Sequence, residues 1–272
     1  MEWKLKVPKI CHFYWGGDIL SYMRYMSIPS FIKQNPDWQV ILWVPKYPSV
    51  KRSWTSNQLS YDVQCEDFVP KLKDLPITIN EIDIEPLGLP NSISELHKSD
   101  LVCYFLLATY GGVWADMDIL FFKPMTELAV NNPENINKET FVCISHYGHS
   151  NGLLMSAGNN PFFQKLTGYC RDNFDPMGYQ SIGPTMVNKY FPKFEDVDKL
   201  TPAVNIDMDA VYAHNAQHIS DIVSGVPPRF TEKSIGIHWY AGHPLWGKFI
   251  QETNGGQTNL PNNIIGNVLK SL

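Results

Sequence analysis

Residues 99–122 read SDLVCYFLLATYGGVWADMDILFF, a helical pattern followed by two short apolar pieces. Apolar residues recur at helical spacing from Leu101 to Ala108, and Gly111-Gly112 predicts the end of the helix. The apolar pieces at 113–115 and 119–122 have the composition of buried strands. This stretch therefore predicts a helix, a tight turn and two strands in succession.

The flanking sequence continues the alternation of strands and helices. Ser92 and Glu95 have the spacing of a capping box, which predicts where the long helix begins. Further strands are expected at 9–15, 39–44, 77–82, 141–145, 152–156 and 235–239, and further helices at 30–34, after Pro161, after Pro184 and at 264–272. This order predicts an α/β fold, a Rossmann-like mixed sheet flanked by helices. We expect one domain over residues 1–252 and a tail at 253–272 that is weakly structured at first and then docks as a helix.

The composition restricts the class of protein. The chain has 272 residues, 44% of them hydrophobic and 18% charged, which is typical of a globular protein and not of a disordered one. A net charge of -5 argues against a nucleic-acid partner. The five cysteines form no CxxC pair, so buried thiols are expected. With no apolar run long enough for a signal peptide or a membrane span, we expect a soluble, cytoplasmic protein.

Two carboxylates, Asp116 and Asp118, lie between the apolar pieces of the central stretch. Buried charge is costly unless it is compensated, and a divalent cation would compensate it. On an extended segment residues i and i+2 project from the same side, so both carboxylates could face one Mg²⁺ or Mn²⁺ that also holds a diphosphate. An Asp-x-Asp tripeptide alone is more often a solvated turn, but the apolar flanks favour a functional site.

A third ligand for that cation could be His238, because a neutral imidazole suits Mn²⁺ and a charged one suits phosphate. His243 competes for this role. A core histidine without function is an equally good interpretation of His238.

Several segments resemble the sugar-binding region of the DXD-containing glycosyltransferases. This family includes fungal α-1,6-mannosyltransferases, capsular polysaccharide and lipooligosaccharide transferases and, more distantly, the clostridial glucosylating toxins. The resemblance is strongest over 99–119 and covers residues 7 to about 246, through segments similar to the family's first strand (7–16), second strand (35–43), Thr-Gly-Pro segment (181–184) and His-containing strand (237–239). It implies a GT-A type fold, a metal-dependent nucleotide-sugar donor and retention of anomeric configuration.

The resemblance also implies roles for individual residues. Asp118 would bind the metal, and Asp116 would contact the metal or the donor ribose. Trp15 would lie against the nucleobase, and Asp100 would accept hydrogen bonds from the donor sugar. Many relatives carry an Arg one turn after Asp100, where this chain has Cys103. Residues three apart share a helix face, so we expect the Cys103 side chain to face the same pocket as Asp100.

Either another cation replaces this Arg, with Lys98 and Arg24 as the candidates, or donor binding is altered.

Weaker candidates complete the expected site. Gln180 could lie beneath the anomeric carbon and Asn151 could contact the sugar, because neutral amides bind hydroxyls, although each is more often a turn residue. Trp54, Trp246 and Tyr240 could stack on acceptor sugars or could belong to the core.

These features together predict a metal-dependent, retaining hexosyltransferase. UDP-glucose or UDP-galactose is the favoured donor and GDP-mannose the next, with a glycan, a lipid-linked sugar or a protein as acceptor. Two alternatives stay open. One is a haloacid-dehalogenase-like phosphatase, disfavoured because the Asp pair is mid-chain and followed by Leu120. The other is a sugar- or nucleotide-binding module of the same fold without turnover.

Overall fold

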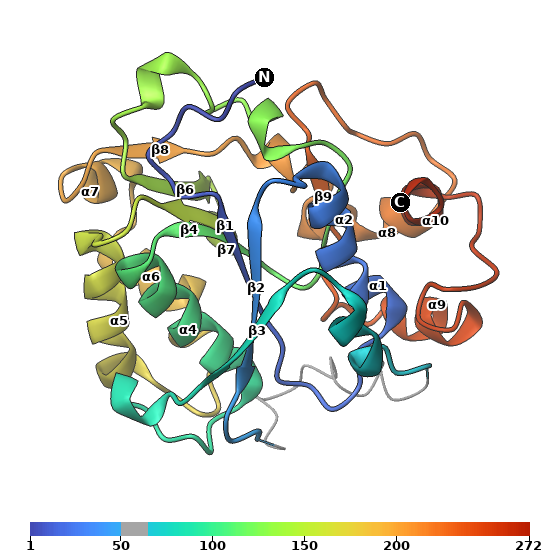
Figure 1. Cartoon of the computed structure of the whole chain (residues 1–272), viewed down its shortest axis with the longest axis horizontal. Helices are drawn as coiled ribbons and strands as arrows, with labels where there is room; N and C mark the ends of the chain where they lie inside the picture. Colours follow the sequence, from blue (N-terminus) through green and yellow to red (C-terminus); the bar gives the residue numbers. More distant parts are fainter. Residues whose placement is uncertain (50–64) are drawn as a thin grey trace.

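The computed structural model describes residues 1–49 and 65–272, and its centre is a seven-stranded mixed sheet in the order β3-β2-β1-β4-β7-β6-β8 (Figure 1). The strands of this sheet are β1 (Ile10–Tyr14), β2 (Gln39–Pro45), β3 (Thr78–Ile82), β4 (Gly112–Ala115), β6 (Thr140–Ser145), β7 (Gly148–Ser156) and β8 (Ala203–Asn205). Strands β3, β2, β1 and β4 are parallel, β7 is antiparallel to both β4 and β6, and β8 is parallel to β6. The sheet itself confirms the mixed α/β class expected of a GT-A type fold.

A second, two-stranded sheet lies at the end of β4. It pairs β5 (Ile119–Phe121) with β9 (Gly236–His238) in antiparallel register, so that Ile119 lies opposite His238. The two strands are more than a hundred residues apart in the chain. This pairing brings the C-terminal third of the molecule to the central Asp pair.

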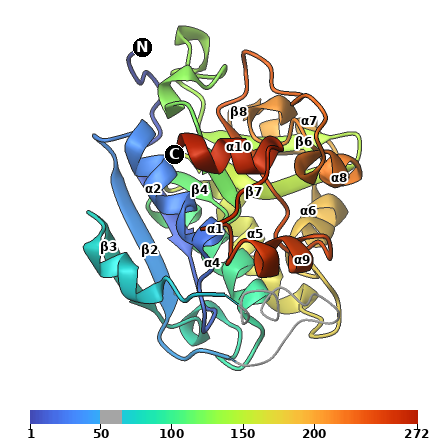
Figure 2. The same cartoon turned by 90° about the vertical axis from the view of Figure 1, so that its right-hand side faces the viewer.

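Helices cover both faces of the sheet (Figures 1 and 2). One face carries α4 (Glu95–Thr109), α5 (Pro161–Asn173) and α6 (Pro184–Tyr190), while α1 (Tyr22–Tyr25), α2 (Ser27–Gln34), α8 (Ile219–Val223), α9 (Trp246–Glu252) and α10 (Ile264–Ser271) lie on the other side. A further short helix, α7 (Phe194–Asp198), packs beside β8. Apolar residues form a core on each face of the sheet and a third core around α8, α9 and α10.

Most predicted elements are present, with shifted ends. The long helix begins at Glu95, and its N-cap is Ser94, whose hydroxyl accepts the backbone N–H of His97. The predicted capping box that begins at Ser92 is therefore wrong, because the hydroxyl of Ser94, one residue before the helix, caps the helix instead. The predicted helix at 30–34 begins three residues earlier, at Ser27.

The C-terminal tail packs closely against the rest of the chain. The backbone N–H of Met23 donates to Gly255 O at 2.8 Å, and Lys33 Nζ donates to the carbonyls of Ser271 and Leu272 at 3.2 and 3.1 Å. Figure 2 shows α10 beside α2. No helix in the described ranges has the length and apolar content needed to cross a membrane.

Candidate active site

The Asp pair lies in the turn between β4 and β5, and the neighbouring strands fix its position. Asp116 N donates to Gly152 O on β7 at 2.9 Å, and Asp118 O accepts the N–H of Trp239 at 2.9 Å. The expected extended segment is wrong, since residues 117 and 118 form a turn, but both carboxylates do face one point as predicted. The turn and the β5–β9 pairing bring the carboxylates and His238 together.

Asp116, Asp118 and His238 form one cluster, in which each offers a ligand atom within 4.8 Å of the others. His238 Nε2 lies 3.1 Å from Asp118 Oδ1 and 3.9 Å from Asp116 Oδ2. The second oxygens are held by the protein, because Trp114 Nε1 donates to Asp116 Oδ1 at 2.9 Å and Ala241 N donates to Asp118 Oδ2 at 2.8 Å. Both carboxylates are thereby oriented toward the same point.

The electrostatics of the cluster follow from its burial. Burial lowers the pKa of His238, but the carboxylates of Asp118 and Asp116 outweigh that effect and raise this pKa to about 9. Burial raises the pKa of Asp118, yet His238, the charge of Arg24 and the Ala241 N–H bring this pKa down to about 2. Asp118 is therefore ionised beside a protonated His238.

These residues fit a divalent cation. Carboxylate oxygens with one imidazole nitrogen are a donor set that suits Mn²⁺ and Mg²⁺. The ring atom His238 Nδ1 is buried and has no hydrogen-bond partner among the described residues, so the protein does not fix the ring orientation through this atom. A bound ion would replace the proton that now offsets the charge of the carboxylates.

The space around the cluster depends on Gly152. A Cβ at this position would lie 2.7 Å from Tyr212 Oη, 3.0 Å from His238 Cδ2 and 3.1 Å from Asp116 Oδ2. No local signal marks Gly152 or Tyr212 in the sequence, and we did not predict either residue.

The cluster opens into a cavity of about 620 Å³. Every residue predicted above to be catalytic, sugar-binding or metal-binding, except Trp15, lines this cavity: Asp100, Asp116, Asp118, Asn151, Gln180 and His238. His243 and Tyr240 line it as well. The structure thus gathers residues from β7, α4, the loop after α5 and the segment after β9 at one place. His238 and not His243 contacts the carboxylates.

Asp100 occupies one wall of the cavity. Asn151 Nδ2 donates to Asp100 Oδ1 at 3.3 Å and to Tyr104 Oη at 2.6 Å, while Asp100 Oδ2 is buried with no partner among the described residues. Burial raises the pKa of Asp100 to about 7, with a smaller contribution from Asp116. Asp100 thus brings to the cavity wall a carboxylate with one oxygen that has no hydrogen-bond partner among the described residues.

Gln180 lines the cavity with a left-handed backbone, at φ 57°. Such a conformation is uncommon for a residue with a side chain and is found preferentially at functional sites.

Trp15 lies outside the residues that line the cavity. The guanidinium carbon of Arg24 is 5.0 Å from the centroid of the Trp15 ring and 5.7 Å from that of Trp239. Trp15 Nε1 is buried with no partner among the described residues. The nucleobase role of Trp15 stays a prediction.

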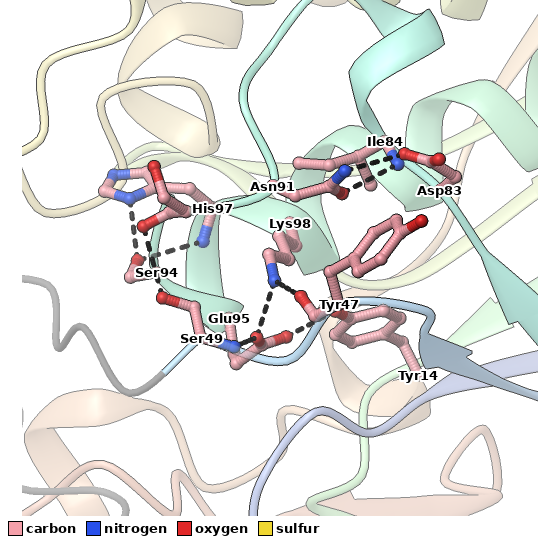
Figure 3. Close-up of polar contacts among 11 residues, drawn as sticks. Tyr14, Tyr47, Ser49, Asp83, Ile84, Asn91, Ser94, Glu95, His97 and Lys98 are labelled. Carbon is pink, nitrogen blue, oxygen red and sulfur yellow. Dashed lines mark hydrogen bonds and ion pairs between the residues drawn. The ribbon is translucent and has the colours of Figure 1, made fainter.

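The two cations proposed to replace the family Arg differ in their surroundings. Lys98 is buried, and its Nζ donates to Glu95 Oε1 at 2.8 Å and to Tyr47 O at 2.6 Å (Figure 3). Arg24 lowers the pKa of Asp118, so its charge acts on the cluster. Neither side chain lines the cavity among the described residues, so replacement of the family Arg by one of them stays a prediction.

Cys103 belongs to the core beneath α4 and is 1% exposed. Our expectation that it would occupy the Arg position inside the cavity is wrong, because its side chain turns into the core.

The aromatic candidates for acceptor binding separate clearly. Tyr240 lines the cavity, with its ring centroid 4.3 Å from that of His238. Trp246 is fully buried against Trp239 and Phe249, so of the two alternatives it belongs to the core. Trp54 lies outside the described residues. Tyr147 and Tyr179 also line the cavity, although nothing in the sequence had distinguished them.

Comparisons with known proteins relate the chain to glycosyltransferases. Residues 24–141 match the family described as "Glycosyltransferase sugar-binding region containing DXD motif". Over 204 residues the chain is 26% identical to inositol phosphoceramide mannosyltransferase 1 of Schizosaccharomyces pombe, which covers 70% of this chain and 52% of that protein. Over 130 residues it is 24% identical to subversion of eukaryotic traffic protein A of Legionella pneumophila, which covers 45% of this chain and 18% of that protein.

The chain thus spans about half the length, or less, of these relatives. Among solved structures, the PaToxG glycosyltransferase aligns with a TM-score of 0.47 and 15% identity over 71% of this chain and 73% of that one. The family match and the fungal relative confirm the resemblance to the DXD-containing glycosyltransferases.

Proposed function

We propose that this chain transfers a hexose from a nucleotide-diphosphate sugar to a hydroxyl group, with a divalent cation held by Asp116, Asp118 and His238. The observation that carries the proposal is the position of this cluster at a cavity that also contains Asp100. The family match over residues 24–141 supports the same reaction class. Residues 1–252 would form the transferase domain and 253–272 the docked tail.

The protein groups have distinct tasks in this proposal. A bound Mn²⁺ or Mg²⁺ supplies positive charge to the departing diphosphate. Asp100 accepts hydrogen bonds from the donor sugar through its unpartnered oxygen, and Asn151 orients that carboxylate. Gln180 contributes a neutral amide near the anomeric carbon, where it stabilises developing charge. Trp15 lies against the nucleobase, and Arg24 adds positive charge behind Asp118.

The donor is proposed to be UDP-glucose, UDP-galactose or GDP-mannose. The name of the fungal relative brings a mannose donor into consideration as strongly as the two UDP sugars. The acceptor is a glycan, a lipid-linked sugar or a protein, and Tyr240, Tyr147 and Tyr179 offer aromatic faces to it.

A donor-hydrolysis assay tests the function. We expect sugar release from one of these donors with Mn²⁺, loss of activity with EDTA and recovery when Mn²⁺ is restored. Phosphate release from simple monoesters would favour the phosphatase, and donor binding without turnover would favour the binding module. Neither outcome is compatible with the transferase.

Asp118→Asn is the matched variant for this assay. The amide oxygen still accepts the Ala241 N–H, so the fold is expected to persist, while the negative charge that holds the cation is lost. Full activity in this variant would contradict the metal site.

Retention of anomeric configuration is also proposed, on the resemblance and on the carboxylates of the cavity. Among the described residues that line it these are Asp100, Asp116 and Asp118, of which two are assigned to the cation and one to the sugar. Proton NMR of the first-formed product should show an α-linked sugar. A β-linked product would show inversion and would make Asp100, with its raised pKa, the candidate base.

A further inference from the structure

His97 connects helix α4 to the loop at 174–183, which carries Gln180. His97 is fully buried and lies one turn before Asp100, on the same face of α4. Its Nε2 is 3.1 Å from Gly178 O, and its ring packs edge-on against Phe174 with centroids 5.1 Å apart. On the other side of the ring, Nδ1 lies 2.8 Å from Ser94 Oγ (Figure 3).

The hydrogen bonds define the protonation of this ring. A carbonyl oxygen only accepts, so Nε2 carries the proton and donates it to Gly178 O. Nδ1 then accepts the hydroxyl hydrogen of Ser94, and the oxygen of Ser94 remains free to accept the His97 backbone N–H as the N-cap of α4. Burial lowers the pKa of His97, which is consistent with a neutral ring. One side chain therefore serves both the helix start and the loop.

The loop is internally hydrogen-bonded, and the ring of His97 ties it to α4. Asp175 N donates to Ser181 Oγ at 3.2 Å, and the Ser181 hydroxyl donates to Asp175 O at 3.0 Å. Ser181 Oγ also lies 3.3 Å from His97 Nε2. Gln180, between these anchor points, keeps a left-handed backbone that persists only when the surroundings hold it.

We propose that His97 is a positioning residue for the transfer reaction, which holds Gln180 at the cavity wall in register with Asp100. This inference rests on the proposed function. His97 itself does not line the cavity among the described residues, so its effect on the reaction acts through Gln180.

A double-mutant cycle tests the connection. His97→Ala should lower the transfer rate by about tenfold or more, because small misplacements of a catalytic group cost this much or more. Affinity for the nucleoside diphosphate should be unchanged. In a Gln180→Ala background the same His97→Ala change should have little further effect on the rate. His97→Gln should recover most of the rate, since its amide N–H can donate to Gly178 O.

The control is His214→Ala. His214 is also fully buried, accepts the Arg229 N–H at 3.0 Å and packs edge-on against Phe230 at 5.6 Å, but it does not line the cavity among the described residues. We expect both His variants to lower the melting temperature and only His97→Ala to lower the rate of the folded protein. Equal rate losses by His97→Ala in both Gln180 backgrounds would overturn the proposal.

Amide hydrogen exchange separates this inference from the proposed function. His97→Ala should accelerate exchange at Gly183, whose N–H donates to Gln180 O at 2.9 Å, whether or not a donor is turned over. Unchanged exchange there would overturn the inference, whereas failure of the wild-type protein to use any nucleotide sugar, with accelerated exchange in the variant, would overturn the proposed function.

Discussion

At the residue scale, the candidate site combines three carboxylates with a glycine that leaves room beside them. Paired carboxylates in an apolar setting indicated a cation, and the resemblance added Asp100; all three side chains line one cavity. The sequence could not reveal Gly152 or Tyr212, because their importance lies in contacts between distant segments. It also misplaced Cys103, since spacing along a helix does not say which way a helix rotates on its sheet.

Gly152→Ala should weaken metal binding without unfolding the protein. The added methyl would crowd Tyr212 Oη, His238 Cδ2 and Asp116 Oδ2, each within 3.1 Å. We expect a loss of Mn²⁺ affinity of about 10- to 100-fold, as for other changes that reorient metal ligands. Titration with Mn²⁺, followed by electron paramagnetic resonance of the free ion, measures it.

Gly225→Ala is the control for this variant, because a Cβ there meets nothing within 4 Å. The same affinity in both variants would mean that the cluster relaxes around the methyl group.

Asp100 should make the stability of the metal-free protein depend on pH. Its pKa is raised to about 7 in the folded protein, against about 3.9 in an unfolded chain, so the folded state binds the proton more tightly. This contribution to stability is present below about pH 4 and is lost as the pH rises to about 7. Asp100→Asn cannot titrate. As the pH rises from 4 to 7, the free energy of unfolding of the Asp100→Asn variant should therefore increase relative to that of the wild type.

Urea unfolding in EDTA at several pH values measures this difference. Parallel stability curves for the two proteins would show that Asp100 has an ordinary pKa in the folded state.

At the scale of elements, a clear local sequence pattern decided which parts could be predicted. The long helix, α5 and the strands of the large sheet other than β8 carry such a pattern. The elements α1, α7, α8, α9 and β8 carry none, and tertiary packing forms them. Interactions between elements, such as the buried contacts of Glu95, could not be predicted at all.

Gly16→Ala tests how tightly α4 is joined to β1. A Cβ at Gly16 would lie 2.0 Å from Glu95 Oε2. This carboxylate cannot move easily, because it accepts hydrogen bonds from Tyr14 Oη at 2.5 Å, Ser49 N at 2.6 Å and Lys98 Nζ at 2.8 Å (Figure 3). We expect a loss of about 1–3 kcal/mol in the free energy of unfolding, the usual cost of overpacking.

Gly168→Ala in α5 is the matched control, since its Cβ meets nothing within 4 Å and alanine favours a helix by up to about 1 kcal/mol. Chemical denaturation should show a lower free energy of unfolding for Gly16→Ala and a higher one for Gly168→Ala than for the wild type. A neutral Gly16→Ala would show that the Glu95 contacts rearrange at little cost.

Over the whole molecule, the candidate site is assembled by long-range pairing. Asp118 comes from the middle of the chain and His238 from its C-terminal third, and the pairing of β5 with β9 joins them. The third core lies directly behind this pair: it contains Leu120, Ile237 and Trp239 together with the apolar face of α10. No sequence pattern predicts that α10 packs with β5 and β9. The docked tail therefore supports the strands that carry Asp118 and His238.

Ile265→Ala should consequently affect metal binding as well as stability. Ile265 is fully buried on α10, and its truncation is expected to cost about 2–5 kcal/mol. The cavity left behind Ile237 and Trp239 loosens the strand that holds His238, so Mn²⁺ affinity should fall even where the variant is fully folded. Val197→Ala, on α7 in another core, also creates a buried cavity but lies beside β8, at the edge of the large sheet. If both variants keep the wild-type Mn²⁺ affinity at a temperature where both are folded, α10 contributes to stability alone.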